Sequence, residues 1–190
     1  MTISDLLEGA KPILFQDEMV RAIERKESPK VVTRRVIKPQ PAWGCSVFWS
    51  TLSGSWRIEG QTTAVKCSWR KGDVLYVRQA WRELGDGTID FRSDYEPLKT
   101  KRSHKTRKSA GVSWKPSIHL KKNNCRLLLR VTDVRAERLQ KMDDSDAVAE
   151  GVLDLKSFRD LWDSIHDDDG YEWIKDPWVW VVEFERLVWQ

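Results

Sequence analysis

The run Lys30-Val31-Val32-Thr33-Arg34-Arg35 constrains the fold of this chain more than any other stretch. Its β-branched residues favour an extended strand. Side chains alternate along a strand, so Thr33 shares a face with Arg35 while Lys30 lies on the other face. Two interpretations follow. The run is a half-buried strand with solvated basic ends, or a bend near Pro29 brings Lys30 and Thr33 together at a pocket.

The second interpretation has a chemical consequence. A hydroxyl group next to a lysine of lowered pKa is one way to build a nucleophile and its base. Lys30 and Thr33 are therefore candidate catalytic residues.

Length and composition favour an ordinary globular protein. The 190 residues are 40% hydrophobic and 33% charged, which suits one domain, 1–190, with a sizeable core. The three cysteines are widely spaced, which argues against a disulfide framework and for a reducing, cytoplasmic location. The first ten residues lack the basic region of a secretory signal, and no apolar run could span a bilayer. Scattered histidines predict no metal site, and we expect no cofactor.

Charge is distributed unevenly along the chain. Residues 1–132 carry 26 Lys and Arg against 13 Asp and Glu, whereas residues 133–190 carry 7 against 16. Eleven Lys and Arg and no acid lie between Glu96 and Asp133. Such a block predicts a polyanionic partner, most simply RNA, or else a solvated basic loop. The predicted nucleic-acid-binding residues are Lys99, Lys101, Arg102, Lys105, Arg107 and Lys108.

Hydrophobic periodicity predicts an α+β chain around a mostly β core. The expected strands are 11–15, 31–37, 47–49, 55–58, 64–67, 74–78, 89–92, 126–134 and 178–187. A helix capped by Asp17 should run to Glu27. A short helix, 145–150, should follow a cap at Asp143 or Asp144. A second helix, capped by Ser157, should bury a stripe of Phe158, Leu161, Trp162 and Ile165. Residues 93–113 read as a mobile loop.

The eleven tryptophans have two readings. Tryptophan stacks on bases in single-strand binding, and it is also the largest filler of protein cores. We expect Trp162, Trp178 and Trp180 in the core. One or two of those in the basic half could stack on bases: Trp43, Trp49, Trp56, Trp69, Trp81 and Trp114.

Several segments in order resemble the ASCH domain group of the PUA-like superfamily, in the versions carried by tailed phages and prophages. They are 11–15, 19–23, 30–39, 72–78, 114–119, 131–135, 147–151 and 178–187. The resemblance implies a small, strongly bent β-barrel with helices packed at its ends. Insertions would fall at about 42–70 and 86–125.

Within that group, small bacterial N4-acetylcytidine amidohydrolases use a lysine, a threonine three residues later and a distant glutamate. Lys30, Thr33 and Glu150 match this triad. Glu150 also ends its expected helix, where an acid is unfavourable for the helix dipole, and such a misfit can mark a residue held for another reason. The resemblance implies a nucleophilic Thr33, a basic Lys30, and Glu150 orienting Lys30 or a water.

Substrate-binding residues are predicted beside the triad. His119 has an alternative reading as a structural histidine. The predicted function is removal of an acyl group from an N4-acylated cytidine by an amidohydrolase. The alternatives are a non-catalytic RNA-binding module and a ribonuclease, with no prediction of oligomeric state. The predicted substrate-binding residues are Arg35, Tyr76, Arg78, Trp81, Ser117 and His119.

Overall fold

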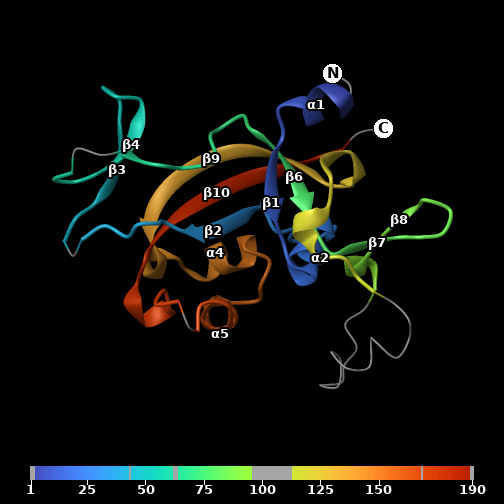
Figure 1. Ribbon diagram of the computed structural model, residues 1–190. Helices are drawn as coiled ribbons and strands as arrows, with labels where there is room; N and C mark the ends of the chain where they lie inside the picture. The colour runs from blue at the N-terminus through green and yellow to red at the C-terminus, as the bar shows by residue number, and fades with distance from the viewer. Residues whose placement is uncertain (1–2, 43, 62–63, 96–112, 168, 189–190) are drawn as a thin grey trace. The chain divides into compact units, whose positions relative to one another are not determined.

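The computed structural model describes residues 3–42, 44–61, 64–95, 113–167 and 169–188. Five strands form a mixed sheet in the order β1-β6-β9-β10-β2 (Figure 1). The chain divides into two compact units. Unit 1 comprises Met1–Arg25, Val74–Leu129 and Arg186–Gln190, and unit 2 comprises Lys26–Asp73 and Arg130–Glu185. Among the described residues, no helix is long and apolar enough to cross a membrane.

The main strands of unit 2 come from distant parts of the chain. They are β2 (Val32–Val36), most of β9 (Leu128–Arg138) and most of β10 (Trp178–Leu187). Strand β2 is antiparallel to β10, with Thr33 opposite Val182 and Arg34 opposite Val181. Both strands are rich in β-branched and aromatic residues, which pack well on a pleated surface.

One face of these strands forms the main core of unit 2. Figure 1 shows α4 (Asp144–Ala149) and α5 (Leu155–Ile165) together on one side of β2 and β10. Val32 and Val181 pack there against Ala147, Phe158 and Trp162. Apolar burial of this kind is the main force that holds helices against a sheet.

A complete capping box starts helix α4. The Asp143 carboxylate accepts a hydrogen bond from the Asp146 main-chain nitrogen at 2.9 Å, and Asp146 accepts one from the Asp143 nitrogen. The predicted cap at Asp143 is therefore confirmed. The helix ends at Ala149, so Glu150 is its C-cap, and Gly151 follows with a positive φ of 89° that favours glycine.

Helix α5 starts earlier than predicted. Its N-cap is Asp154, whose carboxylate accepts from the Ser157 main-chain nitrogen at 2.7 Å. The prediction of Ser157 as the cap was wrong, because Ser157 already lies inside the helix. The predicted stripe holds at Phe158 and Trp162, which are buried, but Ile165 at the last turn is exposed.

A second correction concerns helix α2 (Asp17–Glu24). Its N-cap is Gln16, and Asp17 is the first helical residue. The prediction of Asp17 as the cap was wrong, because its carboxylate accepts from the Arg92 Nε instead. The helix also ends three residues before the predicted Glu27.

The tryptophan-rich part of unit 2 forms a small antiparallel sheet. It contains β3 (Val47–Ser50), β4 (Ser55–Ile58) and β5 (Ala64–Val65). Trp49 lies opposite Trp56, and Trp56 lies opposite Val65. All three strands were predicted, because short apolar runs alternate there with glycine turns. The predicted core residues Trp162, Trp178 and Trp180 are buried.

Unit 1 is described by itself. Strands β1 (Lys11–Leu14) and β6 (Val74–Arg78) pair in parallel. A hairpin follows, formed by β7 (Trp81–Glu83) and β8 (Ile89–Phe91). The helices are α1 (Ile3–Glu8) and α2, with 3₁₀ helices η1 (Arg92–Asp94), η2 (Ser117–His119) and η3 (Lys122–Asn124). Two further 3₁₀ helices belong to unit 2, η4 (Leu139–Lys141) and η5 (Trp173–Lys175).

The predicted α+β class is confirmed. Among the described residues the strands form no closed barrel, and β1 and β2 stand at the two ends of the sheet order. Helix α1 and strand β7 were not predicted. Of the expected mobile loop 93–113, residues 96–112 lie outside the described part of the chain.

The cap of α5 can be tested by mutation. Asp154→Ala removes the acceptor for the Ser157 nitrogen, so it should lower the midpoint of urea unfolding. The matched control Ser157→Ala keeps that nitrogen and should lower the midpoint less. Circular dichroism during urea titration measures both. A larger loss in Ser157→Ala would contradict the observed cap.

Candidate functional site

The chain before β2 is fixed between β10 and the end of α4. The Phe184 nitrogen donates to the Val31 carbonyl at 2.8 Å, and the Val31 nitrogen donates to the Ala149 carbonyl at 2.9 Å. These two bonds extend the β2–β10 ladder beyond Val32 and join it to the helix end. The second bond brings Lys30, which precedes Val31, close to Glu150, which follows Ala149.

Lys30 and Glu150 meet at this junction. The Lys30 Nζ donates to the Glu150 carbonyl at 2.8 Å and also contacts its carboxylate Oε2. Lys30 is 2% exposed and Glu150 8%. A cation that donates to the carbonyl at the end of a helix is favourable for the helix dipole. The acid that ends this helix is therefore held by the lysine that caps it.

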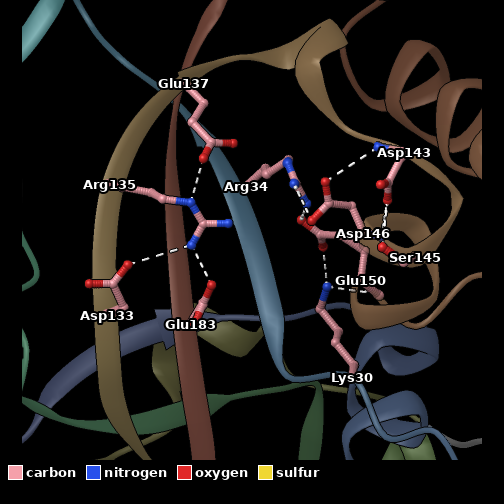
Figure 2. A network of polar contacts seen from close by, with 10 residues as sticks. All are labelled: Lys30, Arg34, Asp133, Arg135, Glu137, Asp143, Ser145, Asp146, Glu150 and Glu183. Atoms are coloured by element: carbon pink, nitrogen blue, oxygen red, sulfur yellow. Dashed lines mark hydrogen bonds and ion pairs between the residues drawn. The ribbon is translucent and has the colours of Figure 1, made fainter.

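Arg34 connects the same carboxylate to helix α4. Its Nη1 donates to Glu150 Oε1 at 3.3 Å, and its Nη2 lies 3.1 Å from Asp146 Oδ1 as an ion pair. Figure 2 shows the Lys30 and Arg34 side chains pointing toward Glu150, with Asp146 beside Arg34. Asp146 and Glu150 are four residues apart, so they share one face of the helix. Two cations and two carboxylates thus form one network, in which Lys30, Arg34 and Glu150 are buried and the Asp146 side chain is 30% exposed.

Burial controls the protonation of Lys30. Desolvation lowers the pKa of the amine from its ordinary value, and the positive charges of Arg35 and Arg34 lower it further. Glu150 acts in the opposite direction through its charge and its hydrogen bond, but burial outweighs it. The pKa of Arg35 is also lowered by burial, against the effect of Glu150. The site therefore favours the neutral amine more than an exposed lysine would.

Thr33 occupies a different position. It is buried in β2 opposite Val182. Alternation directs its side chain away from the face that carries Arg34. Within the described part of the chain, we observe no hydrogen bond from its hydroxyl to Lys30 or Glu150. The structure brings two of the three triad residues into contact, and the role of Thr33 as nucleophile stays a prediction.

An open pocket adjoins the network. It has a volume of about 370 Å³. Two of its lining residues, Val31 and Ala149, are the chain neighbours of Lys30 and Glu150, and Asp146 is the partner of Arg34. Its lining offers carboxylate and hydroxyl oxygens and, among the described residues, no lysine or arginine. The lining residues are Val31, Val32, Thr132, Ser145, Asp146, Ala149, Glu183 and Phe184.

Glu183, which lines this pocket, also belongs to a second cluster of ion pairs. Arg135 of β9 contacts Glu183 and Glu137, and its Nη1 lies 3.5 Å from Asp133 Oδ2 (Figure 2). Burial lowers the pKa of Arg135, but hydrogen bonds to Glu137 and Glu183 outweigh it, so the pKa is raised overall. The guanidinium therefore stays charged and holds Glu183 in place.

The other predicted binding residues lie elsewhere. Arg35 is on β2 of unit 2, opposite Trp180. The remaining five belong to unit 1: Tyr76 and Arg78 on β6, Trp81 on β7, and Ser117 and His119 on η2. Tyr76 and Trp81 are buried, whereas His119 is exposed. The Arg78 guanidinium lies 5.3 Å from the ring centre of Tyr76, and the Lys115 amine lies 4.5 Å from that of Trp81. Their substrate-binding roles stay predictions.

The six basic residues predicted to bind nucleic acid lie outside the described residues, since all fall within 96–112. Among the described residues, no group of three His, Cys, Asp or Glu is placed to hold a metal ion.

Sequence reasoning missed that Arg34 pairs with Asp146 and that Glu183 lines the pocket. One signal was present for the pair: Asp146 and Glu150 share a helix face, which calls for a cation opposite them. Nothing in the sequence signalled Glu183, because its position in the pocket depends on the pairing of strands far apart in the chain.

Comparison of the chain with protein-family models, with curated proteins and with solved structures found no match.

The lowered pKa of Lys30 predicts a pH-dependent stability. In the unfolded chain the amine titrates near its ordinary value of 10.5. Between the lowered native pKa and this value the unfolded chain binds more protons, so the free energy of unfolding rises with pH. Lys30→Met lacks this contribution. The stability of the wild type minus that of Lys30→Met should therefore increase from pH 8 to pH 10.5.

Urea unfolding of both proteins at each pH measures the difference, and groups common to both cancel. A difference that falls over this range would show that the native pKa of Lys30 is raised.

Proposed function

We propose that this protein is an amidohydrolase that removes an acyl group from an N4-acylated cytidine, with Lys30 and Glu150 activating the nucleophile. The observation that carries this proposal is the buried contact of Lys30 with Glu150, whose chain neighbours Val31 and Ala149 line an open pocket with carboxylate and hydroxyl oxygens. An enzyme base works best when its pKa lies near the working pH. Burial and two neighbouring arginines move the pKa of Lys30 in that direction.

Cleavage of the C–N bond in the proposed reaction involves two proton transfers, both made by Lys30. Neutral Lys30 takes a proton from the nucleophile as the nucleophile bonds to the acyl carbon. The carbonyl oxygen then carries negative charge, which a guanidinium of the network stabilises. The resulting ammonium of Lys30 returns its proton to the departing N4 nitrogen as the C–N bond breaks. Water is consumed overall, and cytidine and a carboxylic acid are released.

The nucleophile is the Thr33 hydroxyl or a water. If it is Thr33, an acyl-threonine ester forms, and a water activated by Lys30 hydrolyses it. If it is water, the acid is released directly. Thr33→Val keeps the size of the side chain and removes the hydroxyl, so it separates the two routes.

The pocket supports a nucleoside as the substrate. Asp146 and Glu183 offer acceptor oxygens, and Ser145 and Thr132 offer hydroxyl groups, which together suit the hydroxyls of a ribose. A phosphate group would instead meet two carboxylates. We therefore propose a free nucleoside, and not a nucleotide, as the preferred ligand of this pocket.

The sequence resemblance supports the same assignment. Lys30, Thr33 and Glu150 match the spacing of the triad, and the chain is α+β. We include the ASCH and PUA-like relationship, with its bent barrel and its insertions at about 42–70 and 86–125, in the proposal. We also propose that the protein is cytoplasmic and encoded by a phage or prophage.

The activity can be tested with purified protein and N4-acetylcytidine, with cytidine release followed by chromatography. We expect turnover that falls at least about 100-fold in Lys30→Met, which removes the base. We also expect kcat/KM for the nucleoside to exceed that for its 5′-monophosphate by about tenfold or more, because like charges meet in the pocket.

Two matched variants test the pocket. Glu183→Gln should narrow the preference for the nucleoside over the monophosphate. Glu185→Gln, a control two residues along the same strand that does not line the pocket, should leave it unchanged. Absence of turnover above Lys30→Met across several N4-acyl groups would overturn the proposal.

A second candidate function is RNA binding without catalysis. The acid-free block of eleven Lys and Arg between Glu96 and Asp133 favours it. In unit 1 the Arg82 guanidinium lies 4.7 Å from the ring centre of Trp114, an aromatic residue of this block, and 5.8 Å from that of Tyr95. RNA binding and RNA cleavage assays, run beside the nucleoside assay, distinguish this module and the ribonuclease from the amidohydrolase.

A further inference from the structure

A second pocket lies in unit 2, on the small sheet of β3, β4 and β5. Its volume is about 210 Å³. That is below the roughly 300–1,000 Å³ of pockets that hold drug-sized ligands, so it suits one flat ring system. None of its lining residues lines the pocket beside Lys30. They are Trp49, Gly54, Ser55, Trp56, Ala64, Val65, Lys66, Cys67, Trp69 and Arg70.

Three tryptophans form the aromatic part of this wall. Trp49 and Trp56 face each other across β3 and β4, with ring centres 5.5 Å apart and nearly perpendicular planes. Trp56 also packs against the buried Trp180, at 5.1 Å between ring centres. Trp49 is 45% exposed, so its ring has a face available at the pocket mouth. The fixed Trp56 and the accessible Trp49 make a stacking platform.

The lining of the same pocket also carries positive charge. Lys66 and Arg70 line the pocket and are exposed, and among the described residues no acid lines it. Arg70 precedes a tight turn in which its main-chain nitrogen donates to Asp73 at 2.7 Å. Gly72, with φ of 91°, then donates to the Val131 carbonyl of β9 at 2.8 Å. The turn therefore fixes this cationic part of the lining to the main sheet of unit 2.

From this combination we infer that the pocket binds one base of a single-stranded nucleic acid, stacked on Trp49, with the flanking phosphates contacted by Lys66 and Arg70. Stacking on an aromatic ring accepts any base, and cations beside it follow the backbone. An apolar, uncharged segment of a partner protein is a less suitable ligand, because it would gain no binding energy from the two exposed cations. The site is separate from the Lys30 network and goes beyond the proposed amidohydrolase.

The test measures binding of fluorescein-labelled (rU)8 and (dT)8 by fluorescence anisotropy at several salt concentrations. Trp49→Ala should weaken binding about tenfold, the loss expected for one stacked base. Phe48→Ala is the matched control, because Phe48 is also 45% exposed and its side chain points to the opposite face of β3. It should leave binding unchanged. RNA and DNA arms show which sugar the site accepts.

The cationic part of the lining has its own readout. Lys66→Ser with Arg70→Ser should reduce the slope of log affinity against log salt by about 1.4, which is 0.7 for each lost phosphate contact on a single strand. Lys71→Ser, a neighbouring exposed lysine outside the pocket, is the control for charge alone. Oligonucleotide binding by the wild type is measured without any nucleoside turnover, so failure of the amidohydrolase proposal would be seen separately.

Ultraviolet crosslinking of an oligonucleotide containing 5-iodouracil, followed by peptide mass spectrometry, locates the contact. We expect adducts on the peptides that carry Trp49 or Trp69. Equal affinities of Trp49→Ala and Phe48→Ala, or no binding of either oligonucleotide by the wild type, would overturn the inference.

Discussion

The contact between Lys30 and Glu150 links the sheet of unit 2 to its helices. It joins the residue before β2 to the end of α4, and Arg34 extends it to Asp146. Charges are expensive to bury unless they are paired and hydrogen-bonded, and removal of one partner from a buried pair costs about 3–5 kcal/mol. The same contact thus fixes a helix end and positions an amine of lowered pKa. Structure and proposed chemistry depend on one arrangement.

The uneven charge of the sequence has a structural counterpart. Much of the acid of residues 133–190 is used within unit 2. Asp146 and Glu150 form ion pairs with Arg34, and three further carboxylates form ion pairs with Arg135. Arg34 comes from the basic half of the chain, so the two halves compensate each other at the sheet. Outside this network, the exposed cations Lys66 and Arg70 line a pocket with three tryptophans and, within the described part of the chain, no acid. The paired charges thus have a structural role, and the unpaired charge of this pocket is the basis of the proposed binding role.

Local signals in the sequence predicted the elements well. The β-branched run of β2, the whole of β10 and the Asp143 cap each carry their cause within a few residues. Asp154 was missed as a cap because Ser157 has the same preference, and side-chain type alone could not choose between them. Asp17 was wrongly predicted as a cap because Arg92, which donates to its carboxylate, is 75 residues away in the chain.

The candidate site was predicted in part for the same reason. Glu150 stood out because an acid is unfavourable at a helix end, and the structure supplies the compensating lysine. The direction in which Thr33 points depends on the register between β2 and β10, which no local pattern contains. The pocket wall at Glu183 likewise depends on long-range pairing. Sequence therefore predicts which residues are unusual, and the fold determines which of them meet.

The protonation of Lys30 tests this account most directly. Wild-type protein with ¹³C-labelled lysine can be titrated by NMR, with the Lys30 signal assigned by its loss in Lys30→Met. The Cε shift reports the charge of the amine. If burial outweighs the pairing with Glu150, Lys30 titrates below the ordinary value of 10.5. A midpoint at or above 10.5 would mean that the pair is a permanent ion pair and that Lys30 cannot serve as the base.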